Sequence, residues 1–301
     1  MSSPTHNLHS SNEMRDLRAI QRSLQAFASS SQTIEILRTV PPAPPKHSNS
    51  PKTLYVLDSS FNPPTRAHLR ICTSALLHDR PKAESKRLLL LLATQNADKA
   101  PKPVAFEQRL VMMSIFAEEM VKGMAAESGH EGVVVDVGVT KKARFVDKAR
   151  VIEECGDYSF IDDEGWRKPI EQVHLTGFDT LVRLLDIKYY PPDHTLAPLE
   201  GLFEKHRVRV TRRTGDAWGG RDEQDEYIWK LQNGQMEDQG GKRQWAERIE
   251  LVEGRKEGEE IVSSTKVREV SKKRDEVELT KLVTEGVGRW IFDEKLYVDG
   301  G

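Results

Sequence analysis

Two short stretches of this sequence place phosphate-binding residue types at the start of a predicted helix. In the first, SSFNPPTRAH (59–68), a Pro-Pro pair separates two serines and a phenylalanine from Thr65 and His68. Prolines keep the turn extended and lack an N–H, which leaves the N–H groups of Ser60 and Phe61 free to face an anion. Thr65 is a good helix N-cap, and His68 lies on the same face of the first helical turn. Because helix starts attract negative charge, this stretch predicts a site for a nucleotide phosphate.

The second stretch, IVSSTKVREV (261–270), repeats this chemistry near the other end of the chain. It offers Ser264, Thr265 and Lys266 at a predicted helix start, with Arg268 one turn further on. A guanidinium can clamp phosphate oxygens with two hydrogen bonds. Each stretch alone has a plainer interpretation, a Pro-rich turn with a surface histidine or hydroxyls that cap a helix. Two such helix starts in one chain favour phosphate binding.

The elements that must position these residues alternate along the chain. Apolar or β-branched runs predict strands near 53–58, 87–93, 132–137, 172–176 and 207–211. Helical patterns are found near 66–79, 104–122, 178–187, 265–273 and 279–292. Such alternation predicts an α/β fold, a Rossmann-like parallel sheet with helices on both faces. Ligands of such sheets bind beyond the carboxyl ends of the strands, where the first stretch lies.

Two segments stand apart from this alternation. Residues 1–51 read as a polar tip, an amphipathic helix and a Pro-rich linker, PPAPPKHSNSP (41–51), which predicts a helical extension before one α/β domain at 52–301. Residues 215–241 are rich in glycine and charge and read as a loop insertion with room for a short helix at 227–231.

The composition excludes several classes of protein. The 301 residues are 37% hydrophobic and 31% charged with a net charge of −2, so we expect no bulk attraction to nucleic acid or to anionic membranes. No apolar run is long enough to span a bilayer, and no secretory signal is visible. Two cysteines are too few for a disulfide framework or a zinc site. We therefore expect a cytoplasmic or nuclear protein.

Together, the motifs resemble a known family. SFNPPTRAH (60–68) is similar to the GSFNPxTxxH form of the HxGH signature of nucleotidyltransferases, and SSTKVR (263–268) to their ISSTxxR signature. The T-x-x-H spelling resembles eukaryotic nicotinamide mononucleotide (NMN) adenylyltransferases, in a divergent, fungal-type branch. Further family elements follow in order: Lys99 after the second strand, LTGFDTL (175–181) for the GxD element, and VTRRTG (210–215).

The resemblance implies a nucleotidyltransferase domain at 52–301 that joins NMN and ATP into NAD⁺ and pyrophosphate. It implies catalytic roles for His68, Lys99 and Arg268. It implies ATP contacts for Ser60, Phe61, Thr65, His68, Gly177, Asp179, Thr211, Arg212, Ser264, Thr265, Lys266 and Arg268. The choice between Arg212 and its neighbour Arg213 stays open. Mg²⁺ is expected to arrive on the ATP phosphates, with no metal site made by the protein.

The sequence also departs from the family pattern. Ser59 replaces the usual glycine before SFNP, where glycine allows backbone to approach phosphate closely. The tryptophan that stacks on the pyridine ring after the third strand is missing. Phe145 and Trp166 are its aromatic substitutes, and they join Ser60 and Phe61 as the predicted acceptor contacts.

Other functions therefore stay open. The acceptor could instead be nicotinate mononucleotide or phosphopantetheine. The chain could also be a non-catalytic, nucleotide-binding regulatory protein that uses its N-terminal helix and residues 215–241 as contact surfaces.

Overall fold

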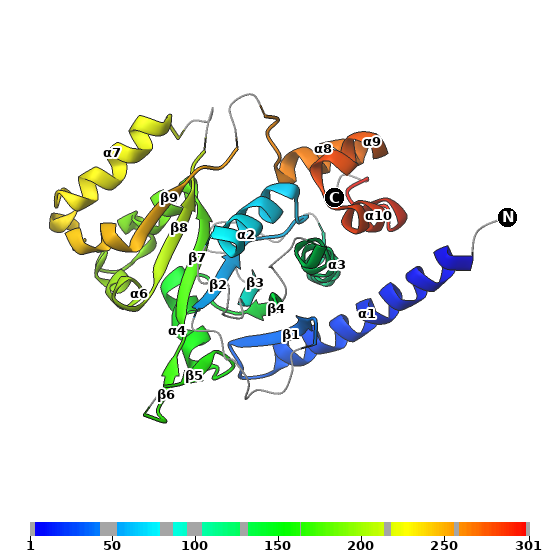
Figure 1. Cartoon of the computed structure of the whole chain (residues 1–301), viewed down its shortest axis with the longest axis horizontal. Helices are drawn as coiled ribbons and strands as arrows, with labels where there is room; N and C mark the ends of the chain where they lie inside the picture. The colour runs from blue at the N-terminus through cyan, green and yellow to red at the C-terminus, as the bar shows by residue number, and fades with distance from the viewer. Residues whose placement is uncertain are drawn as a thin grey trace.

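A seven-stranded sheet forms the centre of the protein (Figure 1). This computed structural model describes residues 4–42, 53–78, 87–94, 104–126, 132–162, 164–213, 218–255 and 259–298, with backbone alone for 4–16. The strand order is β1-β4-β3-β2-β7-β8-β9. The strands are β1 (Ile34–Val40), β2 (Thr53–Asp58), β3 (Arg87–Ala93), β4 (Val134–Thr140), β7 (Glu171–Gly177), β8 (Arg207–Thr211) and β9 (Ile249–Val252).

The last six of these strands in chain order are parallel, and β1 pairs antiparallel with β4. Numbered along the chain, the parallel strands are arranged 3-2-1-4-5-6, the order of a doubly wound nucleotide-binding sheet. The direction of winding reverses between β2 and β7, the two central strands. The predicted Rossmann-like parallel sheet is confirmed, and all five predicted strands are present.

Side chains alternate across the sheet. Tyr55 and Leu57 of β2 share one apolar cluster with Leu90 of β3, whereas Leu54 and Leu89 belong to a second cluster on the opposite face. Because helices cover both faces, Leu88 to Leu92 are all buried, and the strand reads in sequence as one continuous apolar run.

Helices form the two outer layers. The first face carries α1 (Pro4–Ser29), α2 (Arg66–His78), α3 (Phe106–Ala126), α8 (Ser264–Lys273), α9 (Glu276–Leu282) and α10 (Glu285–Asp293). Four further helices contribute to a separate apolar cluster: α4 (Phe145–Glu154), α5 (Phe178–Leu184), α6 (Glu200–Lys205) and α7 (Arg221–Gln232). Shorter elements are the hairpin β5 (Ser159–Ile161) and β6 (Arg167–Pro169), and four 3₁₀ turns, η1 (Ile187–Tyr189), η2 (Ala197–Leu199), η3 (Glu237–Gln239) and η4 (Arg243–Arg248). The helix expected at 227–231 is the longer α7.

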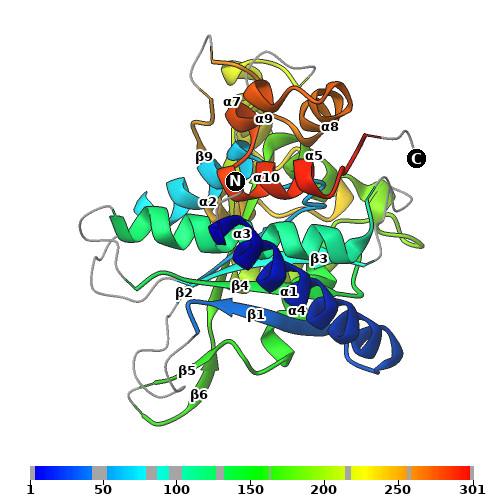
Figure 2. The ribbon, with the colours of Figure 1, turned by 90° about the vertical axis from the view of Figure 1, so that its right-hand side faces the viewer.

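The N-terminal segment is part of this architecture. Helix α1 lies across α3 (Figure 2) and buries Leu17, Ile20 and Phe27. Strand β1 then extends the sheet, with Ile34 opposite Thr140 and Val40 opposite Val135. Before residue 52 the sequence predicted only a helix and a linker, so β1 is an element that it missed. Most of the predicted linker, from residue 43 onward, lies outside the described residues.

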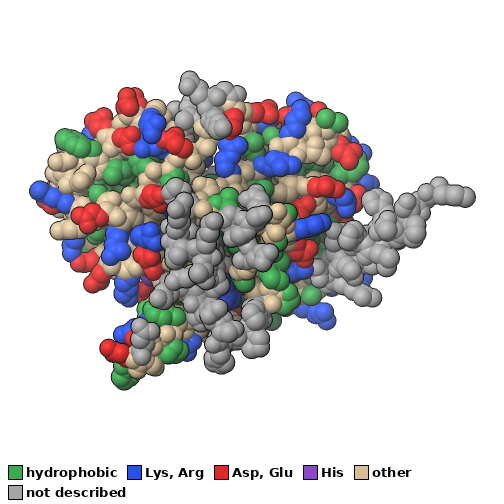
Figure 3. Space-filling view, in the orientation of Figure 1, with side chains coloured by type: hydrophobic (Ala, Val, Ile, Leu, Met, Phe, Trp, Pro, Cys, Tyr) green, Lys and Arg blue, Asp and Glu red, His purple; other side chains and the backbone are tan. Residues whose placement is uncertain are grey.

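On the face seen in Figure 3, acidic and basic side chains are interspersed, in keeping with the net charge of −2. None of the helices in the described part of the chain is long and apolar enough to cross a membrane.

Candidate functional site

A cavity of about 600 Å³ opens where the sheet changes winding direction. Its floor is formed by the carboxyl ends of β2, at Leu57 and Asp58, and of β7, at Leu175 and Thr176. The predicted site residues that line it are Ser60, Thr65, His68, Phe145, Gly177, Asp179, Thr211, Arg212 and Ser264. Residues from five separate stretches of sequence thus meet in the crevice where doubly wound sheets bind ligands.

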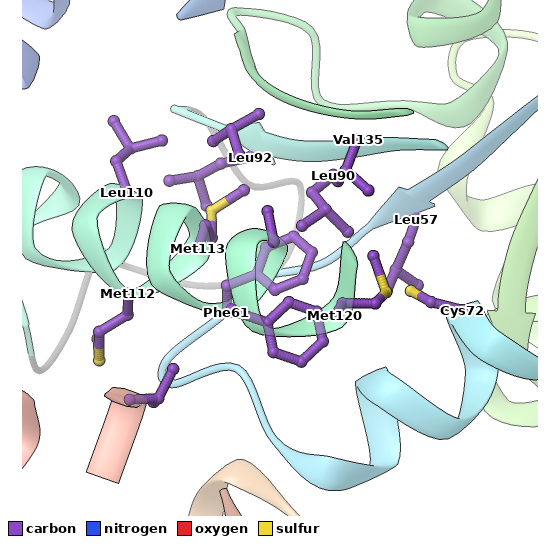
Figure 4. Packing of buried hydrophobic residues seen from close by; sticks show 14 of the residues in the cluster. Leu57, Phe61, Cys72, Leu90, Leu92, Leu110, Met112, Met113, Met120 and Val135 are labelled. Carbon is purple, nitrogen blue, oxygen red and sulfur yellow. The ribbon is translucent and has the colours of Figure 1, made fainter. Parts of the chain in front are cut away.

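The turn after β2 is anchored in the core by Phe61. Its ring is fully buried beside Met113 and Met120 (Figure 4), and its backbone has φ of +43°, a region that bulky residues rarely adopt. Such strain persists only where the surroundings enforce it, and it is typical of functional turns. The Phe61 side chain therefore holds the turn and does not line the cavity, and a ligand contact through its backbone N–H stays a prediction.

His68 is held at the start of α2 by two bonds to one ring nitrogen. The backbone N–H of Thr65 donates to His68 Nδ1 at 3.0 Å, and Thr65 Oγ1 lies 2.9 Å from the same nitrogen. Leu69 N–H bonds the Thr65 carbonyl, so Thr65 caps the helix while His68 reaches back to satisfy its N–H, much as an acidic residue does in a capping box.

These bonds define the tautomer of His68. Because Nδ1 accepts, the proton of the neutral ring is on Nε2, which lies 3.1 Å from Ser59 Oγ. Burial lowers the pKa of His68 to about 4. The ring at the cavity wall is thus a neutral hydrogen-bond donor at neutral pH.

The second helix start is joined to this turn. Ser263 caps α8 by accepting from Lys266 N–H at 3.2 Å. Ser264 Oγ donates to the Pro63 carbonyl at 2.8 Å, and Arg268 Nη1 donates to the Asn62 carbonyl at 2.8 Å. Both predicted phosphate-binding helix starts therefore belong to one site.

The GxD element forms the facing wall. Gly177 ends β7 and precedes α5, and a Cβ there would come within 2.8 Å of Asp179 Oδ1, so a larger residue would displace the Asp179 carboxylate. Arg213 Nε lies 2.9 Å from Asp179 Oδ1, and Arg183 Nη2 lies 3.8 Å from Oδ2. The carboxylate is oriented at the cavity by two guanidinium groups.

The adjacent arginines point to different partners. Arg212 is buried and pairs with Asp225 of α7, with Glu253 at 3.5 Å from its Nε. Arg213 is more exposed and pairs with Asp179, which follows the neighbouring strand β7. Gln224 of α7 holds the backbone of Arg213, accepting from its N–H at 3.3 Å and donating to its carbonyl. Helix α7 thus supports this wall of the cavity.

Aromatic side chains also line the cavity. Phe145 lines it beside Tyr189 and Tyr190, which the sequence reading missed because no motif marks η1. Lys148 lies 5.5 Å from the Phe145 ring and pairs with Asp58 in a nearly buried ion pair. Trp166 is 65% exposed on the β5–β6 hairpin and does not line the cavity.

Cations dominate the lining. Among the described residues, eight Lys and Arg side chains line the cavity against three carboxylates, Asp58, Asp179 and Glu260. This balance suits a polyanion. The described residues contain no group of three or more His, Cys, Asp or Glu that could hold a metal ion.

Some predicted site residues do not line the cavity, and one lies outside the described residues. Arg268 bonds Asn62 and Thr265 Oγ1, at 2.8 and 2.9 Å, and neither Arg268 nor Thr265 lines the cavity. Lys266 also does not line it, and the hydrogen bond that its ammonium donates to Glu260 raises its pKa. Lys99 lies outside the described residues.

No family model matches this chain. A Schizosaccharomyces pombe protein named "Putative nicotinamide mononucleotide adenylyltransferase" is 34% identical over 265 residues, which cover 88% of this chain and 91% of that one. Among solved structures, the chain is similar to Plasmodium falciparum nicotinic acid mononucleotide adenylyltransferase complexed with NaAD, with a TM-score of 0.47, 11% identity, and coverage of 81% of this chain and 97% of that chain. The same Plasmodium enzyme complexed with APC gives a TM-score of 0.47 at 11% identity, covering 81% and 96%.

The His68 geometry predicts its titration. We expect NMR of the imidazole nitrogens to give a midpoint near 4, with Nε2 protonated above it. Because this folded-state pKa lies below the usual value of 6.5, the neutral ring contributes stability above about pH 6.5, and this contribution is lost as the pH falls toward 4. A midpoint near 6.5, or a ring protonated on Nδ1, would contradict the assigned hydrogen bonds.

Proposed function

This chain belongs to the family of nicotinamide mononucleotide adenylyltransferases, and we propose that it joins NMN to ATP, producing NAD⁺ and pyrophosphate. It is a nucleotidyltransferase of the type that adenylylates pyridine mononucleotides. The observation that carries the assignment of the site is the meeting of two helix starts on one cation-lined cavity, at α2 and α8.

The reaction requires alignment more than covalent chemistry by the protein. A 5′-phosphate oxygen of NMN attacks the α-phosphorus of ATP, the new P–O bond forms, and the bond to pyrophosphate breaks. The protein aligns the two phosphates and stabilises the charge that develops on the transferred group. Mg²⁺ carried on the ATP phosphates would neutralise part of that charge.

We assign the transferred phosphate to the start of α2. Thr65, Arg66, Ala67 and His68 of this helix start line a cavity whose cations favour a polyanion. The start of α8, with Ser264 in the lining, would hold the leaving pyrophosphate. Lys266 can join it only by exchanging Glu260 for phosphate, and Lys99 stays a prediction from the motif order.

The adenosine would lie against β7 and β8. Asp179, already oriented by Arg213, is placed to accept hydrogen bonds from ribose hydroxyls, and Thr211 lines the cavity beside it. Arg212 and Arg213 both line the cavity, and we assign the nucleotide contact to Arg213, because Arg212 is bound to Asp225 of α7.

Pairing of the cations supports NMN as the acceptor. Around Phe145, Arg144 is bonded to Asp147 at 2.9 Å, and Lys148 is bonded to Asp58. Arg183 lies 3.8 Å from Asp179. The carboxylate of nicotinate mononucleotide would have to compete with these partners, whereas the neutral amide of NMN would not.

The acceptor is tested by turnover of ATP with NMN, nicotinate mononucleotide and phosphopantetheine, read as pyrophosphate and dinucleotide. We expect the highest kcat/KM with NMN. As a reference, His68→Ala should lower kcat by on the order of 10² to 10³, as the loss of one preorganised donor does. A preference for the nicotinate form would overturn the acceptor assignment, and no turnover with either pyridine mononucleotide would overturn the function.

The pyridine ring is tested at the two predicted aromatics. Phe145→Ala should raise KM for NMN roughly threefold to tenfold with KM for ATP unchanged, since an aromatic contact is worth about 0.5 to 1.5 kcal/mol and acts equally in ground and transition states. Trp166→Ala should change neither constant, because this side chain is exposed and does not line the cavity. An increase in KM for NMN with Trp166→Ala alone would reverse the assignment.

A further inference from the structure

Ser59 occupies the position where the resembled family has glycine. Its backbone conformation does not require a glycine. It continues β2, with its N–H bonded to the Leu91 carbonyl at 3.3 Å. Positive φ at a non-glycine residue occurs in this turn at Phe61 and not at Ser59. The side chain is therefore accommodated without backbone strain, and its hydroxyl lies at the cavity wall.

The hydrogen bonds around Ser59 have a defined direction. The N–H of Thr65 donates to His68 Nδ1, which leaves the ring proton on Nε2. That proton points to Ser59 Oγ, 3.1 Å away, so the hydroxyl oxygen is the acceptor. Within the described part of the chain, His68 is the one hydrogen-bond partner of the Ser59 side chain, which leaves the Ser59 O–H available to a ligand.

We propose that Ser59 is the group that donates to the reacting phosphate in this enzyme, and that His68 acts as the positioning residue behind it. This inference rests on the proposed adenylyl transfer. In this arrangement Thr65 N–H donates to the imidazole, the imidazole donates to the Ser59 hydroxyl, and the hydroxyl donates to a phosphate oxygen. Each bond polarises the next in the same direction, which strengthens the last one. No proton is transferred, and the bonds that form and break at phosphorus are those of the adenylyl transfer.

The same geometry explains how a serine can replace glycine here. With glycine, Nε2–H would open directly onto the cavity and could reach a phosphate oxygen itself. With serine, the hydroxyl oxygen occupies that direction, 3.1 Å from Nε2. The hydroxyl therefore relays the donor function of the histidine to the ligand.

Three variants separate this role from a packing role. Ser59→Ala removes the donor and leaves a methyl group in front of Nε2–H, so kcat should fall roughly 10- to 100-fold, the factor for losing a hydrogen bond to a charged group, with KM for ATP little changed. Ser59→Gly should stay within a few fold of the wild-type kcat, because the ring can then contact phosphate directly. Ser74→Ala, which removes the hydroxyl that accepts from Arg209 at 3.2 Å on α2, is the control and should keep the wild-type kcat.

We expect Ser59→Gly to keep a much higher kcat than Ser59→Ala. If only the size of the side chain mattered, glycine would be the more damaging of the two changes. Wild-type kcat in Ser59→Ala overturns the proposal, and so does a loss in Ser59→Gly equal to that in Ser59→Ala.

A second measurement does not depend on turnover. NMR of the His68 ring should show the Nε2–H protected from solvent exchange in the wild type and in Ser74→Ala, and exchanging faster in Ser59→Ala. An unchanged exchange rate in Ser59→Ala overturns the relay. If the wild type itself turns over no pyridine mononucleotide, the proposed function fails, and that result is distinct from an active wild type with an active Ser59→Ala.

Discussion

The candidate site depends on a set of hydrogen bonds that joins two helix starts about two hundred residues apart. The Asn62 carbonyl accepts from Arg268, its side-chain Oδ1 accepts from Tyr297 OH at 2.8 Å, and the Pro63 carbonyl accepts from Ser264. Asn62 is only 4% exposed, so leaving these groups unpaired would be costly. The turn after β2 is therefore held from both sides, by Phe61 in the core and by α8, and the donors of α2 and α8 are fixed on one cavity.

Much of the fold could be predicted because its physical causes are local. Strands covered by helices on both faces appear as apolar runs, such as Leu88 to Leu92, and each phosphate-binding stretch carries its own helix-start signal. Strand β1 was missed because most of its side chains are only half-buried and it follows a helix. Strand β9 was missed because four residues show too little periodicity.

The site was less predictable because the direction of a side chain depends on tertiary packing. Arg212 and Arg213 are equivalent in sequence, yet α7 draws one away and leaves the other facing Asp179. Trp166 and Phe145 are both aromatic, but only Phe145 lines the cavity. Ser59 departs from the family pattern in sequence, yet in space its hydroxyl meets the ring of His68. In each case, contacts formed in the folded chain decide where the side chain lies.

The central claim is that the two helix starts act as one phosphate site through the Arg268 fork, which reaches both Asn62 and Thr265. The most direct test is kcat for dinucleotide formation by Arg268→Lys, with its unfolding midpoint measured alongside. An ammonium cannot reproduce the planar fork, so the account predicts a kcat lower by about tenfold or more in a protein that remains folded. A folded Arg268→Lys variant with the wild-type kcat and the wild-type KM for ATP would contradict it.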